Sequence, residues 1–263
     1  MIQAVVFNLE STMLDPEGLR LSQGMADIFR WMGVQVGLTD IRRGRGLPLR
    51  EHIAHILQLA EVRRNWVNHY GHEPGLKDVE HIYNELLPML QSMLHGTAPA
   101  KGLNLALQEI RERRIQCGAT SALSLEMLST VPGHVFNTLG LDCMVTPCEV
   151  SNGRPYPWML YEMAQRMQVY PLSDVVKVGD TVIDMQEGRN AGVWTIGVLN
   201  RNEEPAAADG TSAPTPFDKE ERRREAAYNL KRAGAHLIID SLSDLPYMLR
   251  EIELLQHTGG YPA

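Results

Sequence analysis

The chain has 263 residues, 44% of them hydrophobic, which is enough to bury a full core without disulfide bonds. Its formal net charge is −7, with a pI near 5.7, so no global positive field attracts nucleic acid or an anionic membrane surface. No apolar run approaches 18 residues and no export signal opens the chain, so we expect a protein that is neither membrane-spanning nor secreted. Small molecules are the expected ligands.

The three cysteines favour a reducing compartment. Cys117, Cys143 and Cys148 are an odd number and lack the spacing of metal ligands. The first two fall in apolar runs, where a free thiol behaves as a small hydrophobic side chain. A cytoplasmic location is therefore predicted.

The N-terminal part combines one strand with a helical insertion. The run Ile2–Phe7 is typical of a buried strand. From residue 18 to about 98 only helical patterns occur, among them Leu21–Met32, Leu49–Ala60 and Val79–Leu94. This interval predicts an inserted α-helical cap domain, residues 18–97. The Gly- and Pro-punctuated stretch 95–102 that follows suits a hinge.

Strands and helices alternate after residue 100. The predicted strands are Ile115–Ala119, Leu141–Val145, Asp174–Val178 and Trp194–Val198; the predicted helices are Leu103–Arg113, Ser124–Thr138, Pro157–Met167 and Val182–Ala191. Such alternation predicts an α/β fold with a doubly wound parallel sheet, a Rossmann-like core built from residues 1–17 and 98–263. Residues 200–216, rich in Glu, Pro, Ala, Gly and Thr, are expected to form a surface loop.

The segment Val178-Gly-Asp-Thr-Val-Ile-Asp184 carries the strongest chemical signal. It places Asp180 and Asp184 just after a predicted strand, at the sheet edge where open parallel sheets bind ligands. Two carboxylates there can share a hard cation such as Mg²⁺. The alternative is an ordinary helix N-terminus capped by an acidic residue.

This acidic motif resembles the fourth motif of the haloacid dehalogenase superfamily, and the chain as a whole looks most similar to the phosphonoacetaldehyde hydrolase family. The run Gly153-Arg-Pro-Tyr-Pro-Trp-Met159 resembles that family's third motif. The resemblance implies a haloacid-dehalogenase-like fold with a helical cap, a Mg²⁺ cofactor and a homodimer formed through the caps. It also implies that Arg154 and Ser121 bind phosphoryl oxygens, which suits a guanidinium and a hydroxyl.

The resemblance breaks at the first strand. Asn8 stands where the family has a nucleophilic Asp, and a neutral amide oxygen is a far poorer nucleophile than a carboxylate. The covalent intermediate should not form. The metal would keep Asp180, Asp184 and the main-chain carbonyl of Glu10, with weakened affinity because one negative charge is missing.

The cap departs from the family as well. Leu49 falls on the lysine that forms an imine with the aldehyde, and a leucine has no amine. Arg50 is adjacent but out of helical phase, and its guanidinium does not readily lose a proton. His52 falls on a family His, and Arg45 falls where the family has Met. The added positive charge suits an anionic ligand, or it merely solvates the cap.

Glu10 occupies a position where the family has Ala and phosphate-ester members of the superfamily have an acid/base Asp. Three roles are open to this carboxylate. It could act as a general base on water, it could be an unusual nucleophile, or it could neutralise nearby arginines of the cap. General acid–base work alone contributes only ~10²–10⁴-fold, so any remaining hydrolysis should be slow.

The sequence thus predicts a cytoplasmic protein that binds Mg²⁺ and a small phosphonate or phosphorylated metabolite but lacks, or nearly lacks, P–C bond hydrolysis. The alternatives are an active hydrolase that uses Glu10 or activated water, and a protein that acts only through its surface. A cap stripe of Leu21, Met25, Phe29 and Met32, with Trp31 beside it, predicts a homodimer contact unless these side chains pack the cap's own core.

Overall fold

A six-stranded parallel sheet forms the centre of the protein. The computed structural model describes residues 1–14, 20–129, 139–199 and 215–262. The strand order is β3-β2-β1-β4-β5-β6, and every neighbouring pair is parallel. The strands are β1 (Ala4–Asn8), β2 (Gln116–Thr120), β3 (Cys143–Val145), β4 (Val175–Gly179), β5 (Trp194–Val198) and β6 (Leu237–Ile239). The sequence predicted the first five to within two residues and did not predict β6.

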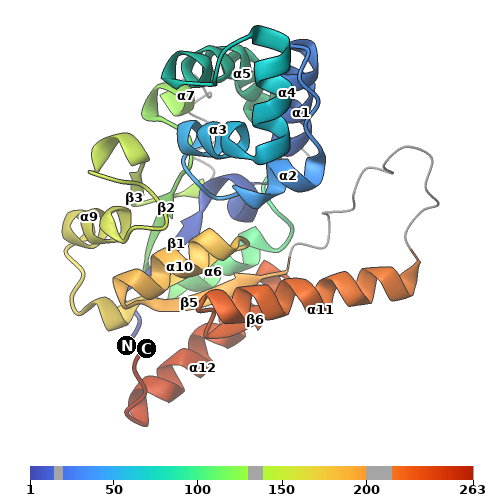
Figure 1. Cartoon of the computed structure of the whole chain (residues 1–263). Coiled ribbons are helices and arrows are strands. Elements are labelled where there is room, and N and C mark those ends of the chain that lie inside the picture. The colour runs from blue at the N-terminus through green and yellow to red at the C-terminus, as the bar shows by residue number, and fades with distance from the viewer. Residues whose placement is uncertain (15–19, 130–138, 200–214, 263) are drawn as a thin grey trace.

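Helices cover both faces of the sheet (Figure 1). Along β1, Val5 and Phe7 face one apolar cluster while Ala4 and Val6 face the other, as the two-residue period of a strand requires. The first cluster includes α6 (Leu103–Glu112) and α12 (Leu245–His257); the second face is covered by α9 (Trp158–Met167) and α10 (Val182–Ala191), with α11 (Pro216–Ala233) packed against α10. The predicted doubly wound α/β architecture is therefore confirmed, with the sheet between two layers of helices.

Two sequence predictions fall partly outside the described residues. Of the helix expected over Ser124–Thr138, the structure describes α7 (Leu125–Ser129), and residues 130–138 lie outside the described ranges. The loop expected over 200–216 likewise lies mostly outside them. Among the described residues, no helix is long and apolar enough to cross a membrane.

Within the described residues 20–97, five α-helices form the helical cap. They are α1 (Leu21–Trp31), α2 (Leu38–Arg43), α3 (Leu49–Gln58), α4 (Ala60–Tyr70) and α5 (Leu76–Gly96). Figure 1 shows them stacked beyond one end of the sheet. The boundary expected at residues 17 and 18 falls outside the described residues, so the exact domain division stays a prediction.

The apolar stripe of α1 packs inside the cap. Met25 and Phe29 are fully buried within this single chain, and Met32 is nearly so, whereas Trp31 is 68% exposed. The sequence left open whether the stripe forms a dimer contact or packs the core of the cap, and these buried side chains pack the core of the cap. The homodimer stays a prediction that now depends on Trp31.

The turn between α2 and α3 brings the cap onto the core. Gly46 has φ +95°, and a Cβ built there would lie 2.6 Å from Thr181 Oγ1. The Leu49 amide donates to the Ala122 carbonyl at 3.0 Å. Only a residue without a side chain can both adopt this left-handed conformation at little cost and approach the core so closely. The cap is therefore closed over the carboxyl ends of the strands.

The segment predicted as a hinge is tied to the exit of β1. The Ala100 amide donates to the Met13 carbonyl at 2.8 Å, and Leu14 and Pro99 form an isolated antiparallel bridge. The two chain segments that connect cap and core therefore run side by side. In this arrangement a movement of the cap would have to bend both segments together.

Candidate functional site

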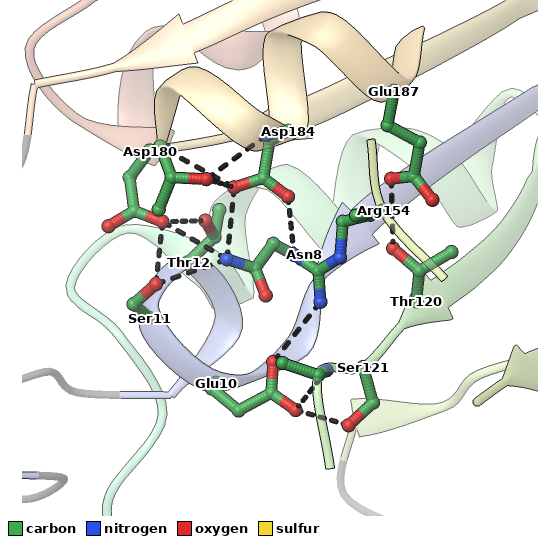
Figure 2. A network of polar contacts seen from close by, with 12 residues as sticks. Asn8, Glu10, Ser11, Thr12, Thr120, Ser121, Arg154, Asp180, Asp184 and Glu187 are labelled. Atoms are coloured by element: carbon green, nitrogen blue, oxygen red, sulfur yellow. Dashed lines mark hydrogen bonds and ion pairs between the residues drawn. The ribbon is translucent and has the colours of Figure 1, made fainter. Parts of the chain in front are cut away.

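The candidate site lies at the carboxyl ends of β2, β1 and β4, three neighbouring strands of the sheet. β1 ends at Asn8 and continues directly into a π-helical turn, Leu9–Met13, which carries Glu10. The chain leaves β1 toward the cap, and β2 and β4 lie on opposite sides of β1. This is the switch point where doubly wound sheets bind ligands. The side chains of the site converge there, as Figure 2 shows.

Asn8 lies between the two acidic residues of the predicted metal site. Its Nδ2 donates to Asp180 Oδ1 at 3.2 Å and to Asp184 Oδ2 at 3.1 Å, and it also contacts Ser11 Oγ at 3.1 Å. The opposite orientation of the amide would aim an oxygen at two carboxylates, so the hydrogen-bond network determines the assignment. Asn8 Oδ1 is buried and has no hydrogen-bond partner among the described residues.

Asp180 receives donors from the core and from the cap. Its Oδ1 accepts from Ser11 Oγ at 2.6 Å and Thr12 Oγ1 at 3.0 Å, both from the π-helical turn. Its Oδ2 pairs with Arg45 Nη2 at 2.5 Å, across the boundary between cap and core. The Asp180 side chain has no exposed surface, so this ion pair closes the outer side of the acidic pair.

Asp184 is held on the first turn of α10, where it belongs to a capping box. Thr181 Oγ1 donates to Asp184 Oδ2 at 2.6 Å and accepts from the Asp184 amide at 3.1 Å. Arg154 Nη1 donates to Asp184 Oδ1 at 2.6 Å, and Lys177 Nζ lies 3.4 Å from the same oxygen. Gly179 makes room for this carboxylate, since a Cβ there would lie 2.4 Å from Asp184 Cβ. The helix-cap role and the site role predicted for this residue therefore coexist.

A second ion pair lies beneath Asp184, and the sequence did not predict it. Lys177, on β4, is completely buried; its Nζ lies 2.7 Å from Glu187 Oε2 and donates to Thr120 Oγ1 at 2.5 Å. A lone lysine in an otherwise apolar strand was the signal available, because a fully buried lysine requires a partner. Its partner Glu187, on α10, could not be located from sequence spacing alone.

Glu10 lies opposite Arg154, on the β2 side of Asn8. One of its carboxylate oxygens, Oε1, accepts a short hydrogen bond from Ser121 Oγ and another from the Ala122 amide at 3.0 Å. The other oxygen, Oε2, is 3.7 Å from Arg154 Nη2. The two side chains predicted to bind phosphoryl oxygens, Ser121 and Arg154, thus both face the Glu10 carboxylate.

Burial and charge oppose each other in this network. Burial by itself would lower the pKa of Arg154, but Asp184, Glu187 and Glu10 raise it, so this guanidinium stays charged. Burial would likewise raise the pKa of Asp184, yet Arg154, Lys177 and the Thr181 hydrogen bonds bring it below its usual range. For Glu187 burial prevails and its pKa is raised, despite the opposing effect of Lys177 and Arg154. Of Asp184 and Glu187, Asp184 is therefore the carboxylate that is more firmly held in its ionised form.

The predicted cap residues separate into two groups. Arg45 reaches the site, and the backbone of Leu49 contacts the core while its side chain packs in the apolar cluster. Arg50 instead pairs with Glu80 at 2.6 Å and stacks on Tyr83 within the cap. His52 is buried, with Nε2 2.6 Å from the Ile41 carbonyl. Arg50 and His52 thus make no site contact in this structure.

The oxygens of the site fit a hard cation only after two rearrangements. Mg²⁺ binds carboxylate and carbonyl oxygens, and the described residues contain no cluster of three or more His, Cys, Asp or Glu that could hold a metal. The unpartnered Asn8 Oδ1 could supply the missing oxygen if the amide turned toward Asp180 and Asp184. Arg45 would also have to release Asp180. The donor set therefore suits Mg²⁺ in the alternative orientation of Asn8.

Comparison with known proteins gives the family. Residues 5–198 match the family model described as haloacid dehalogenase-like hydrolase. The chain is 33% identical to phosphonoacetaldehyde hydrolase of Nitratidesulfovibrio vulgaris, covering 99% of this chain and 94% of that one, and 31% identical to phosphonoacetaldehyde hydrolase of Bacillus cereus strain AH187, covering 96% and 97%. A crystal structure of a phosphonoacetaldehyde hydrolase-like protein from Oleispira antarctica superposes with a TM-score of 0.89 at 22% identity, over 99% of this chain and 96% of that one. The chain therefore belongs to the haloacid dehalogenase-like hydrolases and is a phosphonoacetaldehyde hydrolase-like member of that family.

Proposed function

We propose that this protein binds Mg²⁺ together with a small phosphonate or phosphorylated ligand and does not hydrolyse the P–C bond. The observation that carries the proposal is the position of Asn8, whose amide lies between Asp180 and Asp184 at the end of β1. The predicted role of that strand end in the family is nucleophilic attack. An amide that donates to both neighbouring carboxylates offers no anionic oxygen for such an attack.

The amine needed for imine formation is also missing at the expected place. Leu49 is 3% exposed and its side chain packs in the apolar cluster that the cap shares with the core. Lys177 is the lysine of the polar network, but its ammonium is completely buried and engaged by Thr120 and Glu187. A charged, ion-paired ammonium is not a nucleophile. These contacts support a site that binds without forming an imine.

The alternative of hydrolysis through Glu10 has weaker support. A general base must have a free oxygen within reach of the water that it activates. Glu10 Oε1 already accepts from Ser121 Oγ and the Ala122 amide, and Oε2 faces Arg154. This arrangement favours a charge-neutralising role, with Arg154 of the core as the arginine concerned rather than one from the cap.

In the proposed complex, Asp180, Asp184, Asn8 Oδ1 and the Glu10 carbonyl would hold Mg²⁺. The ion would supply positive charge that neutralises phosphoryl oxygens when a ligand is bound. Ser121 and Arg154 would orient those oxygens from the opposite side, because a hydroxyl and a guanidinium are both hydrogen-bond donors. The closed cap would exclude water from the ligand.

The direct test is an assay for acetaldehyde with phosphonoacetaldehyde and Mg²⁺, with Bacillus cereus phosphonoacetaldehyde hydrolase as the positive control. No turnover is expected from this protein, and borohydride should trap no adduct on a cap residue. Release of acetaldehyde at about 1 s⁻¹ or faster, an ordinary enzymatic rate, would overturn the proposal. A slow release abolished by Glu10→Gln would support the alternative instead.

Metal binding is tested separately by thermal unfolding with Mg²⁺ and methylphosphonate. A ligand that binds only the folded state raises the Tm as its concentration exceeds its Kd. Wild type should therefore be stabilised, and Asp180→Asn should lose the response while keeping the volume of the side chain. Glu73→Ala, which removes an exposed carboxylate of the cap, serves as the control. An equal response in the Asp180 variant would place the metal elsewhere.

A further inference from the structure

Three donors from two separate parts of the chain converge on the carboxylate of Glu10. Ser121 Oγ and the Ala122 amide follow β2, and Arg154 comes from the segment before α9. A hydroxyl, a backbone N–H and a guanidinium aimed at one point form a binding site for an oxyanion. In this structure, the oxyanion within the site is a side chain of the protein itself.

Arg154 has more donors than the described residues use. Its side chain has no exposed surface, and only Nη1 makes a hydrogen bond, to Asp184. Its Nε and Nη2 have no hydrogen-bond partner among the described residues, and Glu10 Oε2 lies beyond hydrogen-bond distance from Nη2. Since a buried donor without a partner is costly, these two nitrogens point to a ligand with more, or better placed, acceptor oxygens than one carboxylate offers.

The charges of the cluster point the same way. Four carboxylates, from Glu10, Asp180, Asp184 and Glu187, face three cations, from Arg45, Arg154 and Lys177, so with every group ionised the cluster carries one net negative charge. The raised pKa of Glu187 moves this balance toward neutrality. Without Glu10 the cluster would be neutral. A phosphoryl group entering the site while Glu10 remains would therefore meet a like charge in a buried environment, where repulsion is strong.

We propose that Glu10 is a resident anion in this site and that small tetrahedral oxyanions bind by displacing its carboxylate from Ser121, the Ala122 amide and Arg154. The proposal rests on the proposed function for the place where the ligand binds, and it predicts that the Glu10 carboxylate lowers the wild-type affinity for the ligand. Glu10 is suited to move because it is the outer member of the ion pair: its side chain keeps 7% exposure while that of Arg154 has none.

The test is a calorimetric titration with inorganic phosphate at constant ionic strength, without metal. Glu10→Ala should lower the Kd for phosphate by about tenfold or more relative to wild type, because the internal competitor is gone. Glu10→Gln should give a smaller gain, since the amide oxygen still accepts from Ser121 and the Ala122 amide but the charge is removed. Acetate, which restores a carboxylate, should compete with phosphate in Glu10→Ala.

Two controls place the new affinity in the site. Ser121→Ala combined with Glu10→Ala should lose most of the gain, and Glu73→Ala, which removes an exposed carboxylate on the cap, should bind phosphate as wild type does. If Glu10→Ala does not fold, Glu10→Gln carries the comparison. Equal phosphate affinity in wild type and both Glu10 variants would overturn the proposal.

The outcome is independent of the hydrolysis assay. Acetaldehyde release by the wild type would contradict the proposed function, yet a gain in phosphate binding on removing Glu10 would still assign the resident-anion role. Conversely, a catalytically silent protein with unchanged phosphate affinity in the Glu10 variants would leave the proposed function standing and remove this inference.

Discussion

Two ion pairs of the same length lie in opposite surroundings. Arg154 and Asp184 meet at 2.6 Å beneath the cap, and neither side chain has exposed surface; Arg63 and Glu73 also meet at 2.6 Å, but on the cap surface, where the side chains are 51% and 60% exposed. Water screens the second pair and competes for its hydrogen bonds, whereas the first pair has only its neighbours. Bond length therefore says little about what each pair does. The surroundings decide whether losing one partner matters.

The largest effect is expected when the buried pair is broken. Arg154→Met leaves Asp184 and Glu10 without their guanidinium and should destabilise the protein by about 3–5 kcal/mol. Urea unfolding followed by circular dichroism measures the loss. The matched variant Arg63→Met should leave the denaturation midpoint unchanged within error. Equal midpoint shifts in the two variants would mean that burial does not distinguish the pairs.

The comparison extends to histidines and to pH. Burial lowers the pKa of His52 to about 4, and the hydrogen bond to Ile41 only partly offsets this, so the folded protein keeps His52 neutral. The unfolded chain binds a proton near pH 6.5. Stability should therefore fall as the pH drops from about 6.5 to 4, by roughly 3 kcal/mol from this residue, and change little further below.

Unfolding free energies of wild type and His52→Gln across that range test this expectation. The variant should show a flatter profile, because it lacks the titrating ring of His52. His81, an exposed residue of α5, supplies the control substitution His81→Gln, which should keep the wild-type slope. A wild-type slope in His52→Gln would assign the acid sensitivity to other groups.

Two capping boxes of the same geometry offer a finer comparison. Thr181 accepts from the Asp184 amide at 3.1 Å beneath the cap, and Thr215 accepts from the Asp218 amide at 3.2 Å on the exposed start of α11. Thr181→Ala should cost about 1–2 kcal/mol, the upper part of the usual range, because it also leaves the buried Asp184 short of a donor. Thr215→Ala should cost clearly less. Thermal unfolding of the two variants orders them, and the reverse order would contradict the argument from burial.

The smallest effect on stability is expected at Trp31, whose exposed ring contrasts with the buried Phe29 two residues earlier. Trp31→Asp should leave the unfolding midpoint nearly unchanged. If the predicted homodimer forms through the cap, the same substitution should shift the mass measured by light scattering toward 29.5 kDa, the mass of one chain. A wild-type mass that stays at 29.5 kDa at high concentration would remove the dimer.

Much of the core fold could be predicted because its signals are local. Short apolar runs and helical periods alternate along the chain, and five strands lie within two residues of their predicted positions. β6, Leu237–Ile239, lies beyond the last predicted strand and was not predicted. The helices α11 and α12 lay beyond the last predicted strand and were not predicted either.

The part of the site that could be predicted is the set of residues placed by the ends of the strands. Asn8, Asp180 and Asp184 could be expected together, because parallel strands deliver their carboxyl ends to one edge. The partners of Glu10 and Arg45 could not, since they depend on β2 lying beside β1 and on how far the cap descends. Ser11 and Thr12 were overlooked as ordinary turn residues, although they bind Asp180.

Gly46 determines how closely the cap can approach the core. Its missing side chain lets the α2–α3 turn rest on Thr181, and a single methyl group there would overlap the threonine hydroxyl. The absence of a side chain at position 46 therefore sets the distance between the cap and the core at this contact. Substitution by alanine would move the turn that carries Arg45 away from the core. The ion pair between Arg45 and Asp180 thus depends on Gly46, a neighbouring residue that has no functional group.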